Sequence, residues 1–448
     1  MRTSPTTSET GQSLYVKAKG IIPGGTHLLS KRPELFLPGH WPSYFSRAEG
    51  ARVWDLDGNC YIDMSHNGVG SCPLGYADTD VNAAVKDAVD RGNMSTLNCA
   101  EEVELAEVLC ALHPWSDMAR FARTGGESMA IAVRVARAHT GRSKVAFCGY
   151  HGWHDWYLAA NLTEADSLGT RGLHLPGLDP AGVPAELAGT AIAFRHNRLD
   201  ELERVVRDHG DGLAAIVCEV QRTVRPTPGF LEGVRAVADR TGAVLVFDEI
   251  SSSFRLNPGG VHLRYGVTPD IAVFAKALGN GYPIAAVIGT RAVMDSAQST
   301  FISSTFWTER VGFAAALAMI AKYRRLGAHE RMSAAGLRVQ DIWRREADKA
   351  GLNVHVGHPD LPPMSHLDFK GSDGRAMQTL LCQLMLERGV LDSGAFFSTY
   401  AHTDDVIDEY ADAVADVFPI LADAHATGDV TDRLKGPVRH SGFQPLTT

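Results

Sequence analysis

Short apolar runs alternate with segments of helical periodicity between about residues 65 and 323. A strand that is apolar at nearly every position is typical of a parallel sheet that is buried on both faces. The alternation therefore predicts an α/β fold in which helices cover a sheet of parallel strands. The predicted strands are Lys144–Phe147, Ala214–Val217, Ala243–Phe247, Ile271–Phe274 and Ala285–Ile288, and helices are predicted at 128–140 and 229–240.

The N-terminal residues show a different pattern. The polar start, MRTSPTTSETGQS, is expected to be a loose tail, and a short helix follows from Leu14 to a turn at Ile22–Gly25. The alternating segments Ala51–Trp54 and Cys60–Asp63 are joined by Asp-Gly-Asn, which predicts a hairpin.

The C-terminal residues predict a smaller α+β domain. Strands are expected near 353–356 and 365–369, and helices at 376–387 and 404–421. We therefore divide the chain into an N-terminal segment (1–64) that packs with the small domain, a large domain (65–325) that carries the site, and a C-terminal small domain (326–448).

Composition and charge exclude several classes of protein. Lys and Arg number 43 against 52 Asp and Glu, so the net charge of −9 has the wrong sign for binding nucleic acid or anionic lipid. We expect no secretion signal and no membrane span, because the longest weakly polar run, Gly312–Ala321, is far shorter than the roughly 20 residues that cross a bilayer. The 7 scattered cysteines form no Cys-x-x-Cys pair, which argues against disulfides and favours a cytoplasmic location.

Two charged residues directly follow apolar strands. Asp248 follows Ala243–Phe247, where an acid is either functional or the first cap of a helix. Lys276 follows Ile271–Ala275, and burial of an unpaired ammonium lowers its pKa, as suits an amine nucleophile. The alternative is a lysine that extends its ammonium to water. Since ligands of open α/β sheets bind at the carboxyl ends of the strands, both residues are site candidates.

Two further features belong to the same edge of the predicted sheet. Gly125 and Gly126 precede a helix, so the backbone N–H groups there form either a phosphate seat or an ordinary cap. The segment Cys148–Trp156 is rich in aromatic residues, which either contact a ligand or pack in the core. His151 and His154 have no third ligand at metal-binding spacing, so no metal site is predicted.

These features together match one cofactor. Pyridoxal phosphate (PLP) needs a lysine amine, a carboxylate that keeps the pyridine nitrogen protonated, an anion seat and an apolar or aromatic plate. The chain resembles the class III aminotransferases of PLP fold type I, the family that includes glutamate-1-semialdehyde aminomutase. The matching motifs, in the order of the family, are Ile22–Thr26, Trp54–Gly58, Gly152–Asp155, Gly229–Arg235, Phe247–Ile250 and Ser304–Thr305.

The resemblance implies a three-layer αβα large domain with a mixed, mostly parallel sheet, and a smaller α+β domain built from N- and C-terminal segments. Within it, Lys276 matches the lysine that bonds to the cofactor and later moves the proton. Asp248 matches the partner of the pyridine nitrogen, Tyr150 the aromatic residue on one ring face, and Ile250 the apolar residue on the other.

The phosphate contacts follow from the same resemblance. Gly125 and Gly126 match the phosphate loop, although the family usually has serine or threonine at the position of Gly126, so backbone N–H groups must serve there. Thr305 matches a threonine that reaches the phosphate of the neighbouring subunit, which implies a homodimer. Arg222 aligns with the position that contacts the ring hydroxyl.

The implied reaction is transamination from an amino donor such as glutamate to an aldehyde or ketone. The stretches Cys148–Tyr157 and Ser303–Glu309 are similar to the aminotransferases that act on the C6′ carbonyl of 2-deoxystreptamine antibiotics. The expected acceptor is therefore the 6′-oxo group of an aminoglycoside, and Trp153 and Trp307 are expected to stack on its sugar rings.

Other functions stay open on the residues alone. Aminomutases bind a substrate carboxylate with an arginine after the Pro-Gly-Gly turn, and Lys31 and Arg32 lie nearest that position. An epimerase of an amino sugar would use the same site without an amino donor. A nicotinamide oxidoreductase lacks its Gly-x-Gly-x-x-Gly loop here, and a binding module on a degenerate scaffold would be expected to lose the lysine or the aspartate.

Overall fold

The computed structural model describes residues 9–162, 178–222, 224–357 and 360–442. The chain divides into two compact units, one made of Met1–Asp78 with Gly327–Thr448 and the other of Thr79–Leu326. Residues 65–78 join the first unit rather than the large domain because Tyr76 bonds to it, with its N–H on Gly50 O at 2.8 Å and its hydroxyl on Asp63 at 2.5 Å. The division of the chain into an N-terminal segment (1–64), a large domain (65–325) and a C-terminal small domain (326–448) stays a prediction.

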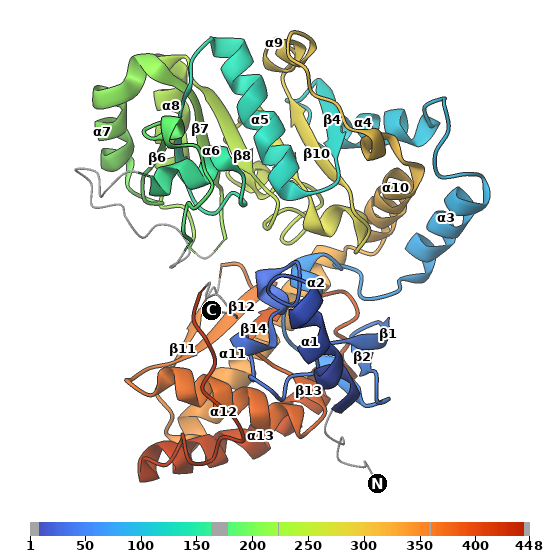
Figure 1. The fold of residues 1–448 in the computed structure, drawn as a ribbon, viewed down its shortest axis with the longest axis vertical. Coiled ribbons are helices and arrows are strands. Elements are labelled where there is room, and N and C mark those ends of the chain that lie inside the picture. Colours follow the sequence, from blue (N-terminus) through green and yellow to red (C-terminus); the bar gives the residue numbers. More distant parts are fainter. Residues whose placement is uncertain (1–8, 163–177, 223, 358–359, 443–448) are drawn as a thin grey trace. The chain divides into compact units, whose positions relative to one another are not determined.

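The large unit, Thr79–Leu326, contains a seven-stranded sheet in the order β4-β10-β9-β8-β7-β5-β6 (Figure 1). Its strands are β4 (Met118–Ala122), β5 (Lys144–Cys148), β6 (Ala191–Ala193), β7 (Leu213–Glu219), β8 (Val244–Asp248), β9 (Ile271–Phe274) and β10 (Ala285–Gly289). Its α-helices are α3 (Thr79–Asp90), α4 (Ala100–Leu112), α5 (Gly125–Thr140), α6 (Asp155–Leu158), α7 (Leu199–His209), α8 (Phe230–Thr241), α9 (Arg291–Met294) and α10 (Arg310–Arg325).

Both faces of this sheet are covered, which explains the continuous apolar runs. Successive side chains of a strand point to opposite faces. Val244 and Val246 of β8 pack in the core beneath α5, whereas Leu245 and Phe247 pack in the core beneath α7 and α8. The predicted three-layer αβα arrangement is confirmed.

The direction of β10 differs from the expectation drawn from its apolar run. β10 pairs antiparallel with both β4 and β9, so the sheet is mixed, as the family resemblance implied. An antiparallel strand buried on both faces is as apolar as a parallel one, so composition does not reveal its direction. The strands β4 and β6 were not predicted, because their runs are short or interrupted by charge.

The first unit joins the two ends of the chain. Its four-stranded sheet has the order β1-β2-β3-β13, and β3 pairs in parallel with β13 from the C-terminal region. A second sheet has the order β11-β12-β14. The strands are β1 (Phe45–Glu49), β2 (Arg52–Asp55), β3 (Cys60–Asp63), β11 (Val354–Gly357), β12 (Met364–Phe369), β13 (Val390–Leu391) and β14 (Ala395–Phe397), and the helices are α1 (Glu9–Ile21), α2 (Asn67–Gly70), α11 (Ala328–Ala350), α12 (Gly374–Leu386) and α13 (Asp404–Thr427).

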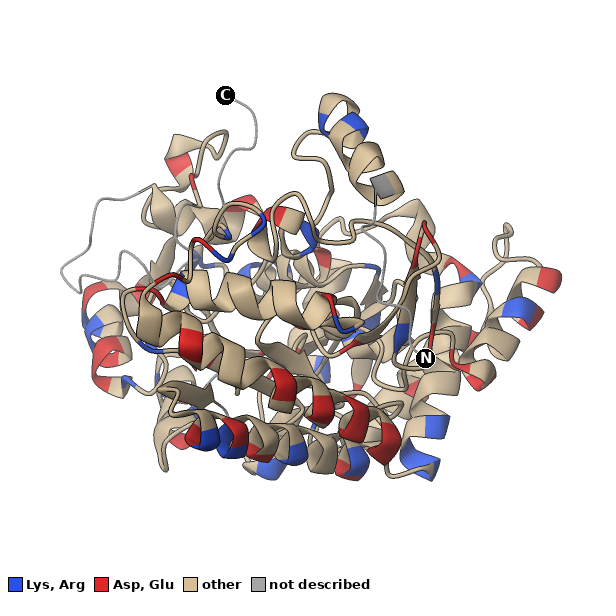
Figure 2. Cartoon of the chain, turned by 90° about the horizontal axis from the view of Figure 1, so that it is seen from below, with Lys and Arg blue, Asp and Glu red and all other residues tan. Residues whose placement is uncertain are grey.

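The polar N-terminal tail is shorter than predicted. Helix α1 begins at Glu9 and includes residues 9–13, while residues 1–8 lie outside the described range. The expected hairpin is confirmed as the antiparallel pair β2 and β3. On the face that Figure 2 shows, some helices carry both acidic and basic residues, whereas α13 contains acidic residues and no Lys or Arg.

Gly336 tests the packing of the first unit. A Cβ at this position in α11 would lie 2.0 Å from Pro362 O, and a backbone atom cannot move aside cheaply. We expect Gly336→Ala to lower the free energy of unfolding by about 1–3 kcal/mol or more, measured by urea denaturation. The control is Gly20→Ala in α1, where nothing lies within 4 Å and alanine should stabilise by about 0.4–1 kcal/mol. Equal effects of the two changes would contradict this packing.

Candidate active site

Asp248 is the last residue of β8, and its side chain is buried, with only 3% of the residue exposed. Its Oδ1 accepts the Ile250 N–H at 3.0 Å, and its Oδ2 lies 2.8 Å from His151 Nδ1. A buried carboxylate needs such partners, because an unpaired charge inside a protein is costly. The strand end and these two contacts hold the carboxylate in one orientation.

His151 is the side-chain hydrogen-bond partner of Asp248. Its Nδ1 lies 2.8 Å from Asp248 Oδ2. Its Nε2 lies 3.1 Å from Cys148 O, and because a carbonyl oxygen only accepts, Nε2 is the donor of that contact. Both ring nitrogens are therefore engaged, which fixes the ring against the carboxyl group.

Lys276 follows β9, the neighbour of β8 in the sheet. Its Nζ donates to Ser251 Oγ at 2.7 Å, and no carboxylate of the described residues forms an ion pair with it. Burial first, and then the Arg222 guanidinium, lower the pKa of Lys276 to about 8. The backbone at Lys276 is strained. Its φ is +40°, a left-handed conformation that costs a non-glycine residue about 1–3 kcal/mol.

Strand register brings the amine and the carboxylate to one edge. Asp248 on β8 pairs with Val273 on the parallel strand β9, and the Glu249 N–H continues the ladder to Val273 O at 2.9 Å. Lys276 lies just beyond this point, near enough for the charge of Asp248 to act on its amine. The two residues singled out at strand ends therefore belong to one site.

The N-terminus of α5 offers an anion seat. The helix begins at Gly125, three residues earlier than predicted, because Thr124 caps it: Thr124 Oγ1 accepts the Glu127 N–H, and the Glu127 side chain accepts the Thr124 N–H. The N–H groups of Gly125 and Gly126 are left without a protein acceptor in the described residues. Two free donors at the positive end of a helix suit a phosphate group.

Both glycines are required by their neighbours. A Cβ on Gly125 would lie 2.8 Å from Ile250 Cδ1, so Ile250 packs against the first turn of α5. A Cβ on Gly126 would lie 2.8 Å from His154 Cε1, and a serine or threonine at this position would meet the ring. The absence of the family's hydroxyl residue at Gly126 thus matches the presence of His154 beside it.

Tyr150 lies beside a charged pair. Its N–H donates to Glu219 Oε2 at 3.0 Å, and the guanidinium carbon of Arg222 lies 5.5 Å from its ring centroid. Arg222 Nη1 also contacts Glu219 Oε1 at 3.4 Å. The opposing placement of Tyr150 and Ile250 on a ring, and a contact of Arg222 with a ring hydroxyl, stay predictions.

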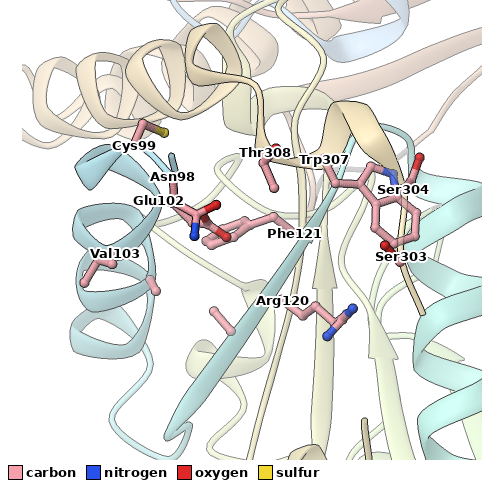
Figure 3. Close-up of a pocket in the computed structure, with 12 residues that line it drawn as sticks. Asn98, Cys99, Glu102, Val103, Arg120, Phe121, Ser303, Ser304, Trp307 and Thr308 are labelled. Carbon is pink, nitrogen blue, oxygen red and sulfur yellow. The ribbon is translucent and has the colours of Figure 1, made fainter. Parts of the chain in front are cut away.

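The tryptophans have different environments. Trp156 is buried and stacks on His151 with ring centroids 6.2 Å apart, so it is a core residue. Trp153 is 69% exposed and lies against His154 at 4.4 Å. Trp307 lines a cavity of about 520 Å³ together with Arg120 of β4 and residues 303–304 (Figure 3). Contacts of Trp153 and Trp307 with a sugar stay predictions.

Three further candidates have local environments that can be described. Thr305 is exposed in this single chain, at the start of the short helix η9 (Thr305–Thr308). Lys31 ends the short helix η1 (Leu29–Lys31) of the first unit, and the Arg32 guanidinium lies against Gly24 of the turn. Their proposed contacts with a neighbouring phosphate and with a substrate carboxylate stay predictions.

The residues of the large unit fit PLP. Lys276 supplies an amine that forms no ion pair with a carboxylate of the described residues, Asp248 supplies a buried carboxyl group, and the first turn of α5 supplies N–H donors that no described acceptor uses. In the described part of the chain, no three His, Cys, Asp or Glu side chains are grouped to hold a metal ion, and no helix is long and apolar enough to span a bilayer.

Comparison with known proteins identifies the family. Residues 38–416 match the model for aminotransferase class-III, which is most of the chain. The chain belongs to the class III aminotransferases and is a PLP-dependent enzyme.

Three relatives of similar identity have different substrates. The chain is 32% identical to a 3-aminobutyryl-CoA aminotransferase of Cloacimonas acidaminovorans, over 87% of this chain and 90% of the relative. It is 32% identical to a 2'-deamino-2'-hydroxyneamine transaminase of Streptomyces kanamyceticus, over 88% and 95%. It is also 32% identical to a glutamate-1-semialdehyde 2,1-aminomutase of Roseiflexus castenholzii, over 93% and 99%.

A solved structure shares the fold. The FumI protein of Sphingopyxis sp. MTA144, in a form with PLP attached, superposes with a TM-score of 0.83 at 26% identity, over 93% of this chain and 97% of that one. The likeness confirms PLP fold type I.

Sequence reasoning missed two contacts of the site. Ser251 was not singled out, although three serines directly follow Asp248-Glu-Ile and could have drawn attention to this segment. His151 was considered only as a metal ligand or a core residue, yet it is the side-chain hydrogen-bond partner of Asp248. Side-chain contacts between separate strands leave no periodic signal in the sequence.

The lowered pKa of Lys276 can be measured in the apo-protein. Burial disfavours the ammonium, so the amine becomes neutral, and therefore reactive, at a lower pH than an ordinary lysine. We expect the rate of acetylation of Lys276 to reach half its maximum at a pH of about 8. Peptide mass spectrometry after a brief exposure to the reagent measures this rate. The other lysines in the same digest are the control. A midpoint for Lys276 equal to theirs would contradict the described burial.

Proposed function

We propose that this enzyme transfers an amino group from a donor such as glutamate to the 6′-oxo group of an aminoglycoside. When bound, PLP supplies a carbonyl that condenses with amines and a ring that holds negative charge. Lys276, as a neutral amine, takes a proton from a substrate carbon and returns it to another carbon. A group that acts first as a base and then as an acid works best when its pKa lies near the working pH, and the pKa of Lys276 is lowered to about 8. Asp248 holds the pyridine nitrogen in its protonated form.

The observation that carries the proposal of a sugar acceptor is the position of Trp153. Its indole is 69% exposed, and its Nε1 would lie 3.6 Å from a Cβ on Gly126, in the first turn of the helix that offers the anion seat. An exposed aromatic face next to the proposed cofactor site suits the apolar C–H face of a sugar ring. The likeness to a neamine transaminase supports the same substrate class.

The neighbouring subunit forms part of this proposal. Thr305 is exposed in the single chain, with its hydroxyl available to another molecule. In the proposed homodimer it contributes to the phosphate site of the partner.

A second candidate is an aminomutase that acts on glutamate 1-semialdehyde. The cations Lys31 and Arg32 follow the Pro-Gly-Gly turn, and the Arg32 guanidinium packs against Gly24 of that turn. A relative of equal identity carries that name. An epimerase of an amino sugar is the third candidate, and it would need no amino donor.

A half-reaction screen distinguishes these functions. We expect glutamate alone to convert the cofactor to its amino form, seen as a change in absorbance, and a 6′-oxo aminoglycoside to reverse the change. Glutamate 1-semialdehyde and the oxo counterpart of 3-aminobutyryl-CoA are the competing acceptors. Lys276→Ala is the control and should remove both changes, because it lacks the amine that is proposed to move the proton. Reversal by the semialdehyde alone would overturn the aminoglycoside assignment, and epimerisation without donor would favour the third candidate.

Trp153 gives a test of the acceptor class. If its indole stacks on a sugar ring, Trp153→Ala should raise the KM for the oxo-sugar about tenfold and leave the KM for the amino donor unchanged. Trp153→Phe keeps an aromatic face and should recover most of the loss. The measurement is steady-state kinetics for each substrate. An unchanged KM for the oxo-sugar would remove Trp153 from the acceptor site.

A further inference from the structure

The hydrogen bond from Lys276 Nζ to Ser251 Oγ is a contact that the proposed function does not use. Its length is 2.7 Å, and Ser251 is buried, with 8% of the residue exposed. An amine on a four-carbon side chain can adopt many positions, and holding it in one place costs rotamer entropy. The contact with Ser251 selects one position.

Ser251 is itself held on both sides. The preceding residue, Ile250, donates its N–H to Asp248 Oδ1, which ties the segment to the carboxylate of the site. Ser251 O accepts the Arg255 Nε–H at 3.2 Å, and Arg255 is only 1% exposed. The hydroxyl therefore belongs to a turn with little freedom to move.

The same turn is tied to β9 and to the interior. The Glu249 N–H donates to Val273 O, and the Glu249 carboxylate accepts the His262 N–H at 2.8 Å and contacts His262 Nδ1 at 2.9 Å. Ser252 Oγ also donates to this carboxylate. Since Lys276 follows β9, the amine and the hydroxyl are fixed to the same pair of strands.

A hydroxyl suits an amine that must change its charge. It accepts a hydrogen bond from an ammonium or from a neutral amine, and it can rotate to donate to the lone pair of the neutral amine. A carboxylate in its place would favour the ammonium strongly, and an apolar side chain would leave a buried N–H without a partner. Ser251 holds the amine in both protonation states.

We propose that Ser251 is a positioning residue for Lys276: its hydroxyl holds the lysine amine whenever that amine is not bonded to the cofactor. The inference rests on the proposed role of Lys276 in moving the proton. In that step a C–H bond of the substrate breaks, an N–H bond forms on Lys276, and the electron pair stays with the carbon. Held by Ser251, the amine takes up and returns the proton from one point.

The first test uses the apo-protein and acetylation of Lys276 across a pH series. Ser251→Ala removes the acceptor of the ammonium, so the midpoint of labelling should fall by about half a unit to one unit below that of the wild type. Ser251→Thr keeps the hydroxyl and should restore the midpoint. The matched control is Ser253→Ala, two residues along the chain, because Ser253 is fully buried and its Oγ has no hydrogen-bond partner in the described residues.

The second test uses the loaded enzyme and the donor half-reaction alone, with 2-deuterated L-glutamate as the probe. A less well-placed amine makes proton transfer slower, so Ser251→Ala should lower the rate of this half-reaction about tenfold or more and raise its primary isotope effect, with the KM for glutamate unchanged. Ser251→Thr should recover both the rate and the isotope effect. Ser253→Ala should change neither.

The outcomes separate this inference from the proposed function. An unchanged labelling midpoint and an unchanged isotope effect in Ser251→Ala would overturn the role of Ser251. Equal changes in Ser251→Ala and Ser253→Ala would show that the effect of Ser251 comes from packing alone, and would also overturn its role as a positioning residue. If Ser251→Ala does not fold, Ser251→Cys keeps the size of the side chain with a weaker acceptor and should give a smaller shift of the same sign. Turnover by Lys276→Ala would instead contradict the proposed role of the lysine, and neither test depends on the acceptor.

Discussion

Burial of the Lys276 amine is the physical constraint on which this account of the site depends. An ammonium taken out of water needs a nearby carboxylate, or it must give up its proton at a lower pH. Here its hydrogen-bond partner is the hydroxyl of Ser251, and its pKa falls to about 8. The lysine is also held at φ +40°, so the fold maintains a strained backbone where the amine must stand. The packed sheet and the turn that carries Ser251 together hold the amine in this position.

The parallel arrangement of β8 and β9 explains why Asp248 and Lys276 lie near each other. Asp248 ends one strand and Lys276 follows its neighbour, so residues far apart in the sequence lie at one edge. His151, fixed by Cys148 O, hydrogen-bonds to the buried Asp248 side chain. Asp248 and Lys276 therefore have separate hydrogen-bond partners: His151 and the Ile250 N–H contact Asp248, and the Ser251 hydroxyl contacts the Lys276 amine.

Much of the large sheet and its two charged strand ends could be predicted from the sequence, because a strand buried on both faces has a continuous apolar run. The runs at β5, β7, β8 and β9 located those strands and, with them, Asp248 and Lys276. The direction of β10 could not be predicted, since an antiparallel strand buried on both faces has the same composition. The start of α5 at Gly125 depended on a capping box at Thr124, and the partnership of Ser251 with Lys276 depended on tertiary contacts. Substrate choice is less accessible still, because relatives of equal identity act on a CoA ester, an aminoglycoside and a semialdehyde.

The central claim is that Lys276 and Asp248 hold one PLP molecule between neighbouring strand ends. A crystal structure of the enzyme reconstituted with PLP tests it most directly. The account predicts electron density continuous from Lys276 Nζ to the cofactor, an Asp248 oxygen within hydrogen-bond distance of the pyridine nitrogen, and the phosphate on the N–H groups of Gly125 and Gly126. Density that attaches PLP to another lysine, or a pyridine nitrogen out of reach of Asp248, would contradict it.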